Sequence, residues 1–215
     1  MPKRKRAMKL QISFDATDLD KTVQIAKSVS DYADIFEVGI VLIHAHGTKA
    51  VEQFRAAFPQ KTILVDTKII DRGKQIIDEL VPLGIDWITV MAGTRKNVIH
   101  AACMQAHEHG IKVMLDLLDS ASLSQSALDA KNMGADAIVF HPPHDEQESL
   151  LFLDKWSMIK DNTTLPIFVS GKIKRETIEN IVKINPDGII VGKSITDAEN
   201  PAQEAQFFYD LIPHQ

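Results

Sequence analysis

One short segment of the sequence combines charged side chains that are able to do chemistry. Residues 66–71 read DTKIID and follow the apolar run TILV, so Asp66, Lys68 and Asp71 stand at or just beyond the end of an expected strand. Two acids around one base can form the centre of an active site or a surface ion-pair network. The segment alone leaves both interpretations open.

The elements that must position this segment are short, apolar and evenly spaced. Segments with apolar residues at helical spacing separate them, which predicts repeated βα units and parallel pairing. We therefore expect one compact α/β domain, a single (β/α)8 barrel, with an open doubly wound sheet as the alternative. The expected strands are LQISF from Leu10, DIFEV from Asp34, TILV from Thr62, WITVM from Trp87, KVMLDL from Lys112, AIVF from Ala137, PIFVS from Pro166 and GIIVG from Gly188.

The stretches that lead into several strands share a pattern, seen in LGIDW, MGADA and NPDGI. We expect Gly84 and Gly134 to end helices in a left-handed cap, after which the chain turns straight into a strand. The barrel domain is predicted over 9–213, and residues 1–8, with MPKRKR, are predicted to be a disordered basic tail.

Composition limits the class of protein. The 215 residues are 45% hydrophobic and carry a formal charge of -5, without the basic excess of a nucleic-acid-binding surface. No apolar run is long enough to span a bilayer. The single cysteine, Cys103, excludes an intramolecular disulfide and is expected to be a core thiol. We expect a soluble, cytoplasmic protein that binds neither nucleic acid nor membrane.

Acids and bases fall where the strands of such a barrel end, which is where its chemistry is usually found. Because Asp66 and Lys68 are two residues apart on a strand, they should share a face, with Thr67 pointing away. The acids need a balancing charge, and a magnesium ion held by Glu37 and Asp66 would supply it beside Lys68. A structural ion-pair network is the alternative. The residues at these strand ends include Asp15, Glu37, Asp66, Lys68, Asp116 and His141.

The last two expected loops, VSGKI and VGKSITDAENP, are short and contain glycine. Such loops let backbone N–H groups approach an anion, and this part of a barrel often holds a phosphate. We expect Ser170, Gly171, Gly192 and Lys193 to form a phosphate site. The alternative is that the glycines only turn the chain.

The histidines divide into three groups. His100, His107 and His109 are expected on a helix surface. His44 and His46 are expected in the loop after the second strand, where two histidines without a third ligand indicate metal binding only weakly. His141, at the end of the sixth strand, is a candidate proton carrier, with a bond to a backbone group as the alternative.

Seven segments resemble the 3-hexulose-6-phosphate synthases and 3-keto-L-gulonate-6-phosphate decarboxylases of the orotidine-5'-monophosphate decarboxylase superfamily. The resemblance extends from about Lys9 to Ile212, and the DxKxxD of residues 66–71 is its most specific part. The segments are QISFD, IFEVG, ILVDTKIID, DWITVMAGT, AIVFH, VSGKI and IIVGKSITDAENPAQEA.

The resemblance implies a homodimer with active sites at the interface, in which Asp71 reaches into the partner's site. It implies that Glu37 and Asp66 ligate Mg²⁺, that Lys68 stabilises an enediolate, and that Asp15 positions Lys68 or substrate. His141 falls at the family's proton-transfer position, and the four residues of the expected phosphate site match its phosphate loops.

Three functions follow from this resemblance. TVMAGT and VMLDLLD resemble the synthases, which condense ribulose 5-phosphate with formaldehyde, whereas the decarboxylases tend to carry a glutamate in the fifth strand. The alternatives are a 3-keto-L-gulonate-6-phosphate decarboxylase and a non-catalytic sugar-phosphate-binding barrel. Three features match neither enzyme: the loop HPPHD after the sixth strand, Ile40 after the second, and Lys172 where the family usually has glycine.

Overall fold

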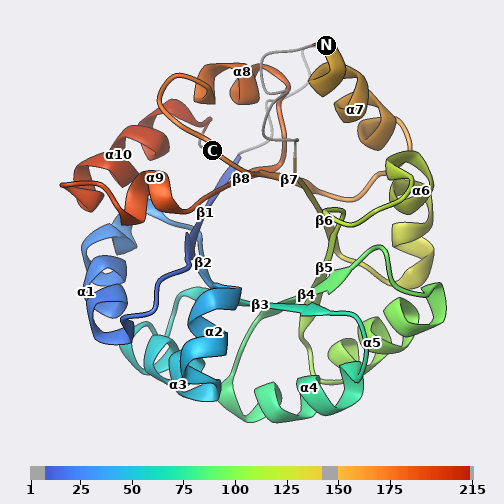
Figure 1. The fold of residues 1–215 in the computed structure, drawn as a ribbon, viewed down its shortest axis with the longest axis horizontal. Coiled ribbons are helices and arrows are strands. Elements are labelled where there is room, and N and C mark those ends of the chain that lie inside the picture. Colours follow the sequence, from blue (N-terminus) through green and yellow to red (C-terminus); the bar gives the residue numbers. More distant parts are fainter. Residues whose placement is uncertain (1–7, 142–149, 214–215) are drawn as a thin grey trace.

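The computed structural model describes residues 8–141 and 150–213, without the side chains of residues 150–152. Its eight described strands are parallel and close into one barrel in which each strand pairs with its neighbours in the sequence, as Figure 1 shows. The predicted (β/α)8 barrel is confirmed. The strands are β1 (Lys9–Phe14), β2 (Ile35–Val38), β3 (Thr62–Ile69), β4 (Trp87–Met91), β5 (Lys112–Asp116), β6 (Ala137–Phe140), β7 (Ile167–Ser170) and β8 (Gly188–Val191).

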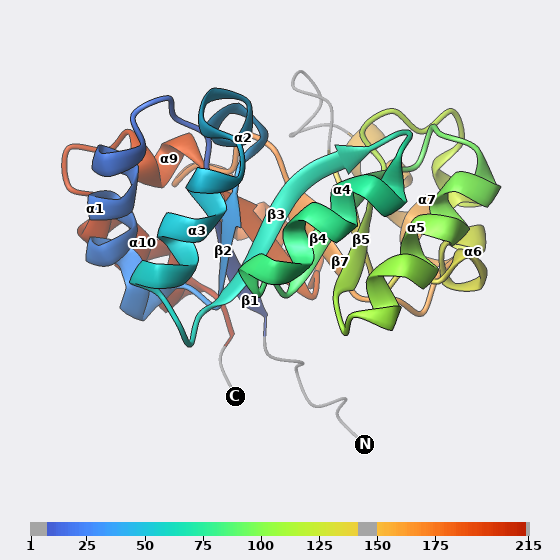
Figure 2. The same ribbon diagram turned by 90° about the horizontal axis from the view of Figure 1, so that it is seen from below.

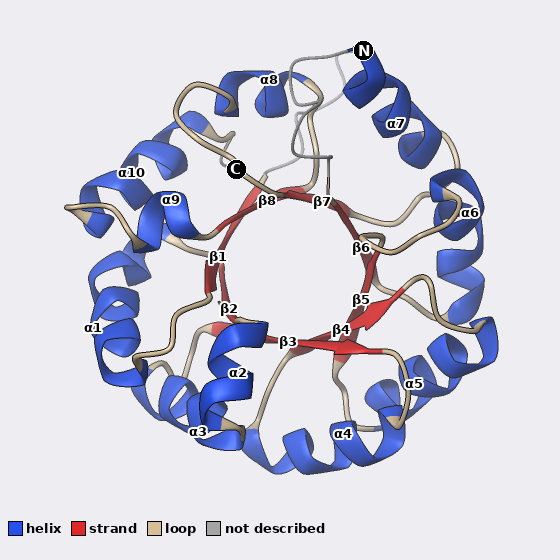
Figure 3. Cartoon of the chain, viewed as in Figure 1, coloured by secondary structure: helices blue, strands red, loops and turns tan. Residues whose placement is uncertain are grey.

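Helices surround the strands as an outer ring (Figure 3). Two 3-10 turns, at Ser30–Tyr32 and Val81–Leu83, join helices to the strands that follow. The helices are α1 (Leu19–Val29), α2 (Ile40–His46), α3 (Thr48–Ala57), α4 (Gly73–Leu80), α5 (Lys96–Glu108), α6 (Leu123–Met133), α7 (Leu150–Lys160), α8 (Ile178–Lys183), α9 (Lys193–Thr196) and α10 (Pro201–Leu211).

The glycine and aspartate of the pattern before the strands have separate tasks. Gly84 and Gly134 have φ angles of 67° and 95°, which confirms the predicted left-handed caps. The aspartates tie neighbouring strands together: the Asp86 carboxylate accepts a bond from the Ile63 backbone N–H, and Asp136 accepts one from Val113. These bonds satisfy backbone donors at the start of the preceding strand.

The core has two parts. Most buried apolar side chains lie between the strands and the helix ring, where Cys103 is fully buried, as predicted. A smaller cluster fills the inside of the barrel, and there Phe168 occupies the space beside Gly188, where a Cβ atom would lie 2.4 Å from the ring. The filled interior leaves the mouth of the barrel for chemistry.

Strand β3 is irregular near its end. Its register with β4 shifts between Val65 and Ile69, and Lys68 has a φ of 43°, in the left-handed region. A bulge of this kind bends a strand and redirects side chains. The alternation of a regular strand therefore does not explain the position of Lys68, although its side chain does lie near Asp66.

The prediction that His44 and His46 lie in a loop after β2 was wrong, because both residues lie in α2. The view in Figure 2 places α2 at the same end of the barrel as the end of β3. His100, His107 and His109 are exposed, as predicted. Among residues 8–141 and 150–213, no helix is long and apolar enough to cross a membrane.

Candidate active site at the mouth of the barrel

The site is built by two successive layers of inward-facing side chains. The lower layer is apolar and belongs to the cluster inside the barrel. Residues two apart on a strand share a face. Two residues further along several of these strands, the inward-facing side chain is polar. The pairs are Ile35 and Glu37, Leu64 and Asp66, Met114 and Asp116, and Val139 and His141.

Lys68 is the centre of the polar layer. Its Nζ lies 2.8 Å from Oδ2 of Asp116 and 3.4 Å from Oδ2 of Asp66. On the other side of Asp116, Nε2 of His141 lies 3.0 Å from Oδ1, a contact by distance rather than an aligned hydrogen bond. Asp116 thus joins Lys68 to His141.

These contacts shift the pKa values of three charged groups, Lys68 and the two aspartates beside it. Burial alone would raise the pKa of Asp116, but contacts with His141 and Lys68 outweigh burial and lower it to about 2. Burial would lower the pKa of Lys68, but Asp66 and Asp116 outweigh it and raise the pKa. The pKa of Asp66 is raised, mainly by burial, although Lys68 opposes the shift. The ammonium of Lys68 therefore stays charged inside the barrel mouth.

Glu37 lies in surroundings that oppose its negative charge. Burial, followed by the negative charge of Asp66, raises its pKa to about 8. Its Oε2 accepts a 2.6 Å hydrogen bond from Nε2 of Gln11, while the buried Oε1 of Gln11 has no partner in the described part of the chain. A cation beside Glu37 would offset the repulsion from Asp66 and would give the Oε1 atom of Gln11 a partner.

The donor set fits a magnesium ion. Glu37 and Asp66 offer carboxylate oxygens, which Mg²⁺ prefers, and Gln11 offers an unpartnered amide oxygen nearby. The described residues hold no group of three or more His, Cys, Asp or Glu side chains placed to bind a metal. Water or substrate oxygens would have to complete the shell, as is usual for Mg²⁺.

Asp15 lies beside this cluster and is held by its own neighbours. Its Oδ2 accepts a 3.0 Å bond from Oγ of Ser13, and its Oδ1 accepts a 3.1 Å bond from the backbone N–H of Val41 in α2. Gly39 makes this possible, because a Cβ there would lie 2.3 Å from Oδ1. Within the described residues, Asp15 has no ion pair with Lys68.

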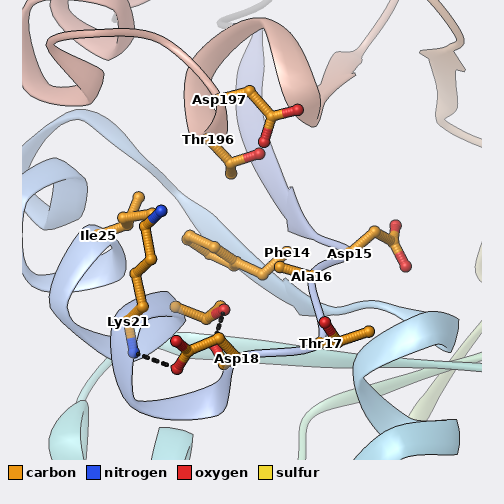
Figure 4. A pocket seen from close by; sticks show the side chains of 10 residues that line it. Phe14, Asp15, Ala16, Thr17, Asp18, Lys21, Ile25, Thr196 and Asp197 are labelled. Carbon is orange, nitrogen blue, oxygen red and sulfur yellow. Dashed lines mark hydrogen bonds between the residues drawn. The ribbon is translucent and has the colours of Figure 1, made fainter.

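A small cavity of about 240 Å³ lies behind Asp15, between the start of α1 and the end of α9. Figure 4 shows the Asp15 carboxylate pointing away from Lys21 and Asp197, two of the polar residues that line this cavity. Asp15 lines both this cavity and the one at the ends of β7 and β8, and its carboxylate is bonded to Ser13 and to the first turn of α2.

The predicted phosphate residues lie together. Ser170, Gly171, Gly192 and Lys193 line one cavity of about 450 Å³ at the ends of β7 and β8. Ser13 and Asp15 line the same cavity, which connects it to the carboxylates of the barrel mouth. Its volume is in the range of small-ligand sites.

Asp71 stands apart from the cluster. Its side chain is 81% exposed and contacts only its neighbour Arg72 among the described residues, through the Arg72 backbone N–H at 2.7 Å and the side chain at 4.0 Å. Pro142, Pro143 and His144 of the HPPHD loop lie outside the described residues.

The sequence did not identify two polar residues, Thr89 and Gln11, as parts of the site, and it gave a third, Asp116, no role. The Thr89 hydroxyl donates to Oδ1 of Asp66 at 2.7 Å and accepts the Lys68 backbone N–H at 2.9 Å, so it holds the bulge of β3. Gln11 holds Glu37, and Asp116, expected at a strand end but given no role, holds Lys68. The signal was available, because polar residues within otherwise apolar strands are rarely buried without a partner.

A closed (β/α)8 barrel with a half-buried lysine, several carboxylates and a glycine-lined cavity at its mouth has the arrangement of a barrel enzyme. The chain matches the model of the Orotidine 5'-phosphate decarboxylase / HUMPS family over residues 8–208 and belongs to that family. The prediction that the protein is a carbon–carbon lyase is confirmed.

Relatives support the same assignment. The chain is 31% identical over 209 residues to 3-hexulose-6-phosphate synthase 2 of Staphylococcus saprophyticus, covering 95% of this chain and 97% of that protein. The crystal structure of 3-hexulose-6-phosphate synthase from Salmonella typhimurium is 30% identical with a TM-score of 0.87, covering 94% and 97% of the two chains. The crystal structure of 3-keto-L-gulonate-6-phosphate decarboxylase from Vibrio cholerae is 26% identical with a TM-score of 0.83, covering 95% of this chain and 98% of that chain.

Proposed function

We propose that the protein is a magnesium-dependent 3-hexulose-6-phosphate synthase that condenses ribulose 5-phosphate with formaldehyde. One observation carries the choice: an aspartate, Asp116, ends β5 and contacts both Lys68 and His141. The shorter side chain leaves more space at the barrel mouth than a glutamate would. The synthase relatives support this choice.

The reaction removes a proton from the carbon beside the ketone of ribulose 5-phosphate. The resulting enediolate adds through that carbon to the carbonyl carbon of formaldehyde, whose oxygen takes up a proton. His141 transfers the protons, and Asp116 orients its ring. The ammonium of Lys68 stabilises the charge on the enediolate oxygens, which is worth most in a site shielded from water.

Glu37 and Asp66 would hold the magnesium ion, with Gln11 beside them. When bound, magnesium supplies positive charge that polarises the ketone oxygen and offsets the two carboxylates. Gly171, Gly192 and Lys193, which line the cavity, would bind the phosphate and so fix the distance from phosphate to ketone.

The proposed assembly is a homodimer with its active sites at the interface. Asp71 is exposed at the end of the barrel that carries the site, and the preceding apolar residue, Ile70, is 63% exposed. Both side chains are therefore free to contact a second copy of the chain.

Solvent-exchange NMR of ribulose 5-phosphate with the protein and Mg²⁺ tests the enediolate directly. We expect exchange of the proton beside the ketone, and consumption of formaldehyde when it is added. Exchange without formaldehyde consumption, together with carbon dioxide release from a 3-keto sugar-acid phosphate, would identify a decarboxylase. Binding with neither exchange nor turnover would identify a sugar-phosphate-binding barrel.

A further inference from the structure

Lys172 adopts a backbone conformation that glycine would adopt more easily. Its φ is 44°, and it follows Gly171, whose φ is 107°. A side chain with a Cβ atom in the left-handed region costs free energy that glycine does not. Lysine is not among the residues that tolerate this region well, so the side chain needs a reason to be there.

The loop around Lys172 is held in place by its neighbours. Ile173 is buried, and its carbonyl oxygen accepts a 2.7 Å bond from Oγ of Ser194. The backbone N–H of Lys174 donates to Oγ1 of Thr177 at 2.9 Å. These contacts fix the loop at the wall of the 450 Å³ cavity and maintain the strained turn.

The cavity has an excess of positive charge. Lys172, Lys174 and Lys193 line it, and in the described part of the chain none of them has an ion pair. Among the described residues the one acid in its lining is Asp15, whose two oxygens are already bonded to Ser13 and to the Val41 backbone. Three lysines against one carboxylate leave two formal positive charges, which match a doubly ionised phosphate.

We propose that Lys172 is a specificity-determining residue that makes this cavity select sugar phosphates whose phosphate group is doubly ionised. The inference rests on the proposed function, because it names the ligand charge that the same site recognises. A glycine at position 172 would offer only its backbone N–H, whereas lysine adds a full charge whose attraction weakens with salt.

The test measures the affinity of inorganic phosphate by calorimetry at a slightly alkaline pH, where phosphate is doubly ionised. Lys172→Gly and Lys172→Met should each weaken binding about tenfold, as expected for a lost charge-assisted bond. Lys172→Arg should stay within about threefold of the parent, because it keeps the charge. The loss in the two neutral variants should shrink at high salt.

A stability measurement separates the two effects of the side chain. Lys172→Gly should raise the melting temperature because it removes the strain at φ 44°, while Lys172→Met should not. Lys183→Met is the matched control, since it removes an exposed lysine from the end of α8, outside the cavity lining. Unchanged phosphate affinity in Lys172→Gly, or an equal loss in Lys183→Met, would overturn the inference.

The same variants separate this inference from the proposed function. With ribulose 5-phosphate and formaldehyde, Lys172→Gly should raise KM and leave kcat near the parent value. If the parent protein has no condensation activity but Lys172→Gly binds phosphate more weakly than the parent, the synthase proposal is refuted and the role of Lys172 is supported. If the parent protein is an active synthase and Lys172→Gly changes neither phosphate affinity nor KM, the synthase proposal is supported and the role of Lys172 is refuted.

Discussion

Nζ of Lys68 and Oδ2 of Asp116 lie 2.8 Å apart, although the two residues are 48 positions apart in the chain. Lys68 stands on the bulge of β3 and Asp116 at the end of β5, with Thr89 of β4 between these strands holding the bulge. The ion pair therefore sets the position of the ammonium at the barrel mouth.

Lys68→Ala should lower turnover by about two to three orders of magnitude or more, because it removes the fixed cation that stabilises the enediolate. Steady-state kinetics on ribulose 5-phosphate and formaldehyde measures the effect. Lys74→Ala, which removes an exposed lysine paired with Asp78 on α4, should leave turnover unchanged. Near-normal turnover in Lys68→Ala would contradict the assigned role.

Asp116→Asn should lower kcat about 100-fold, because both Lys68 and His141 lose the carboxylate that orients them. The stability of the variant should also depend on acidic pH differently from that of the parent. The folded pKa of Asp116 is about 2, below its ordinary 3.8, so its contribution to stability is present above pH 3.8 and is lost as pH falls toward 2.

Melting temperatures measured across that acid range test this second effect. Asp116→Asn should lose less stability than the parent as pH falls through the range, whereas the exposed variant Asp161→Asn should follow the parent. Parallel curves for Asp116→Asn and the parent would show that Asp116 is not held in its charged form.

Glu37→Gln should stabilise the protein at pH 8 when no divalent metal is present. The folded pKa of Glu37, about 8, lies above its ordinary 4.5, so the folded state holds this proton more tightly and stability falls as pH rises between these values. The glutamine removes the charge and can still accept the bond from Gln11.

Adding Mg²⁺ should reverse the order of the two proteins. The parent should gain melting temperature with Mg²⁺, because the ion binds the folded state, and Glu37→Gln should gain little. Glu52→Gln, an exposed change on α3, should behave like the parent. Equal gains in the parent and Glu37→Gln would remove Glu37 from the metal site.

Gly39→Ala should lower kcat by about 100-fold, because the new Cβ would lie 2.3 Å from Oδ1 of Asp15 and displace that carboxylate from Val41. Gly93→Ala is a matched control: its Cβ would lie 2.5 Å from Asp119, outside the site residues described above. Kinetics and melting curves of both variants separate loss of the site from loss of stability. Equal losses of kcat would mean that the clash, not Asp15, matters.

Asp71→Asn and Lys68→Ala should each be nearly inactive, and mixing the two proteins should restore activity. If each site combines Lys68 of one subunit with Asp71 of its partner, random pairing returns roughly a quarter of the parent activity. Activity assays after mixing and subunit exchange measure this. Failure of two exchanged variants to recover activity would place both residues in the same subunit's site or refute the dimer.

Much of the fold followed from periodicity. The apolar runs marked all eight strands, and the glycines at 84 and 134 marked two helix ends, because these signals are local. The segment after β2 was misread as a loop, since its histidines and its start at Gly39 gave no clear helical pattern. The N-cap residue there is Gly39, and the first-turn N–H of Val41 is bonded by Asp15, which is distant in sequence.

The sequence by itself determined the barrel, the family, and the presence of acids, lysines and glycine loops at the strand ends, because strand order fixes which ends meet at the mouth. The family resemblance already separated Asp71 from Asp66 and Lys68 within DTKIID. The tertiary structure decided the contacts: the bulge of β3 turns Lys68 toward Asp116, while Asp71 remains exposed. Those pairings depend on register and on residues far apart in the chain, which no local pattern encodes.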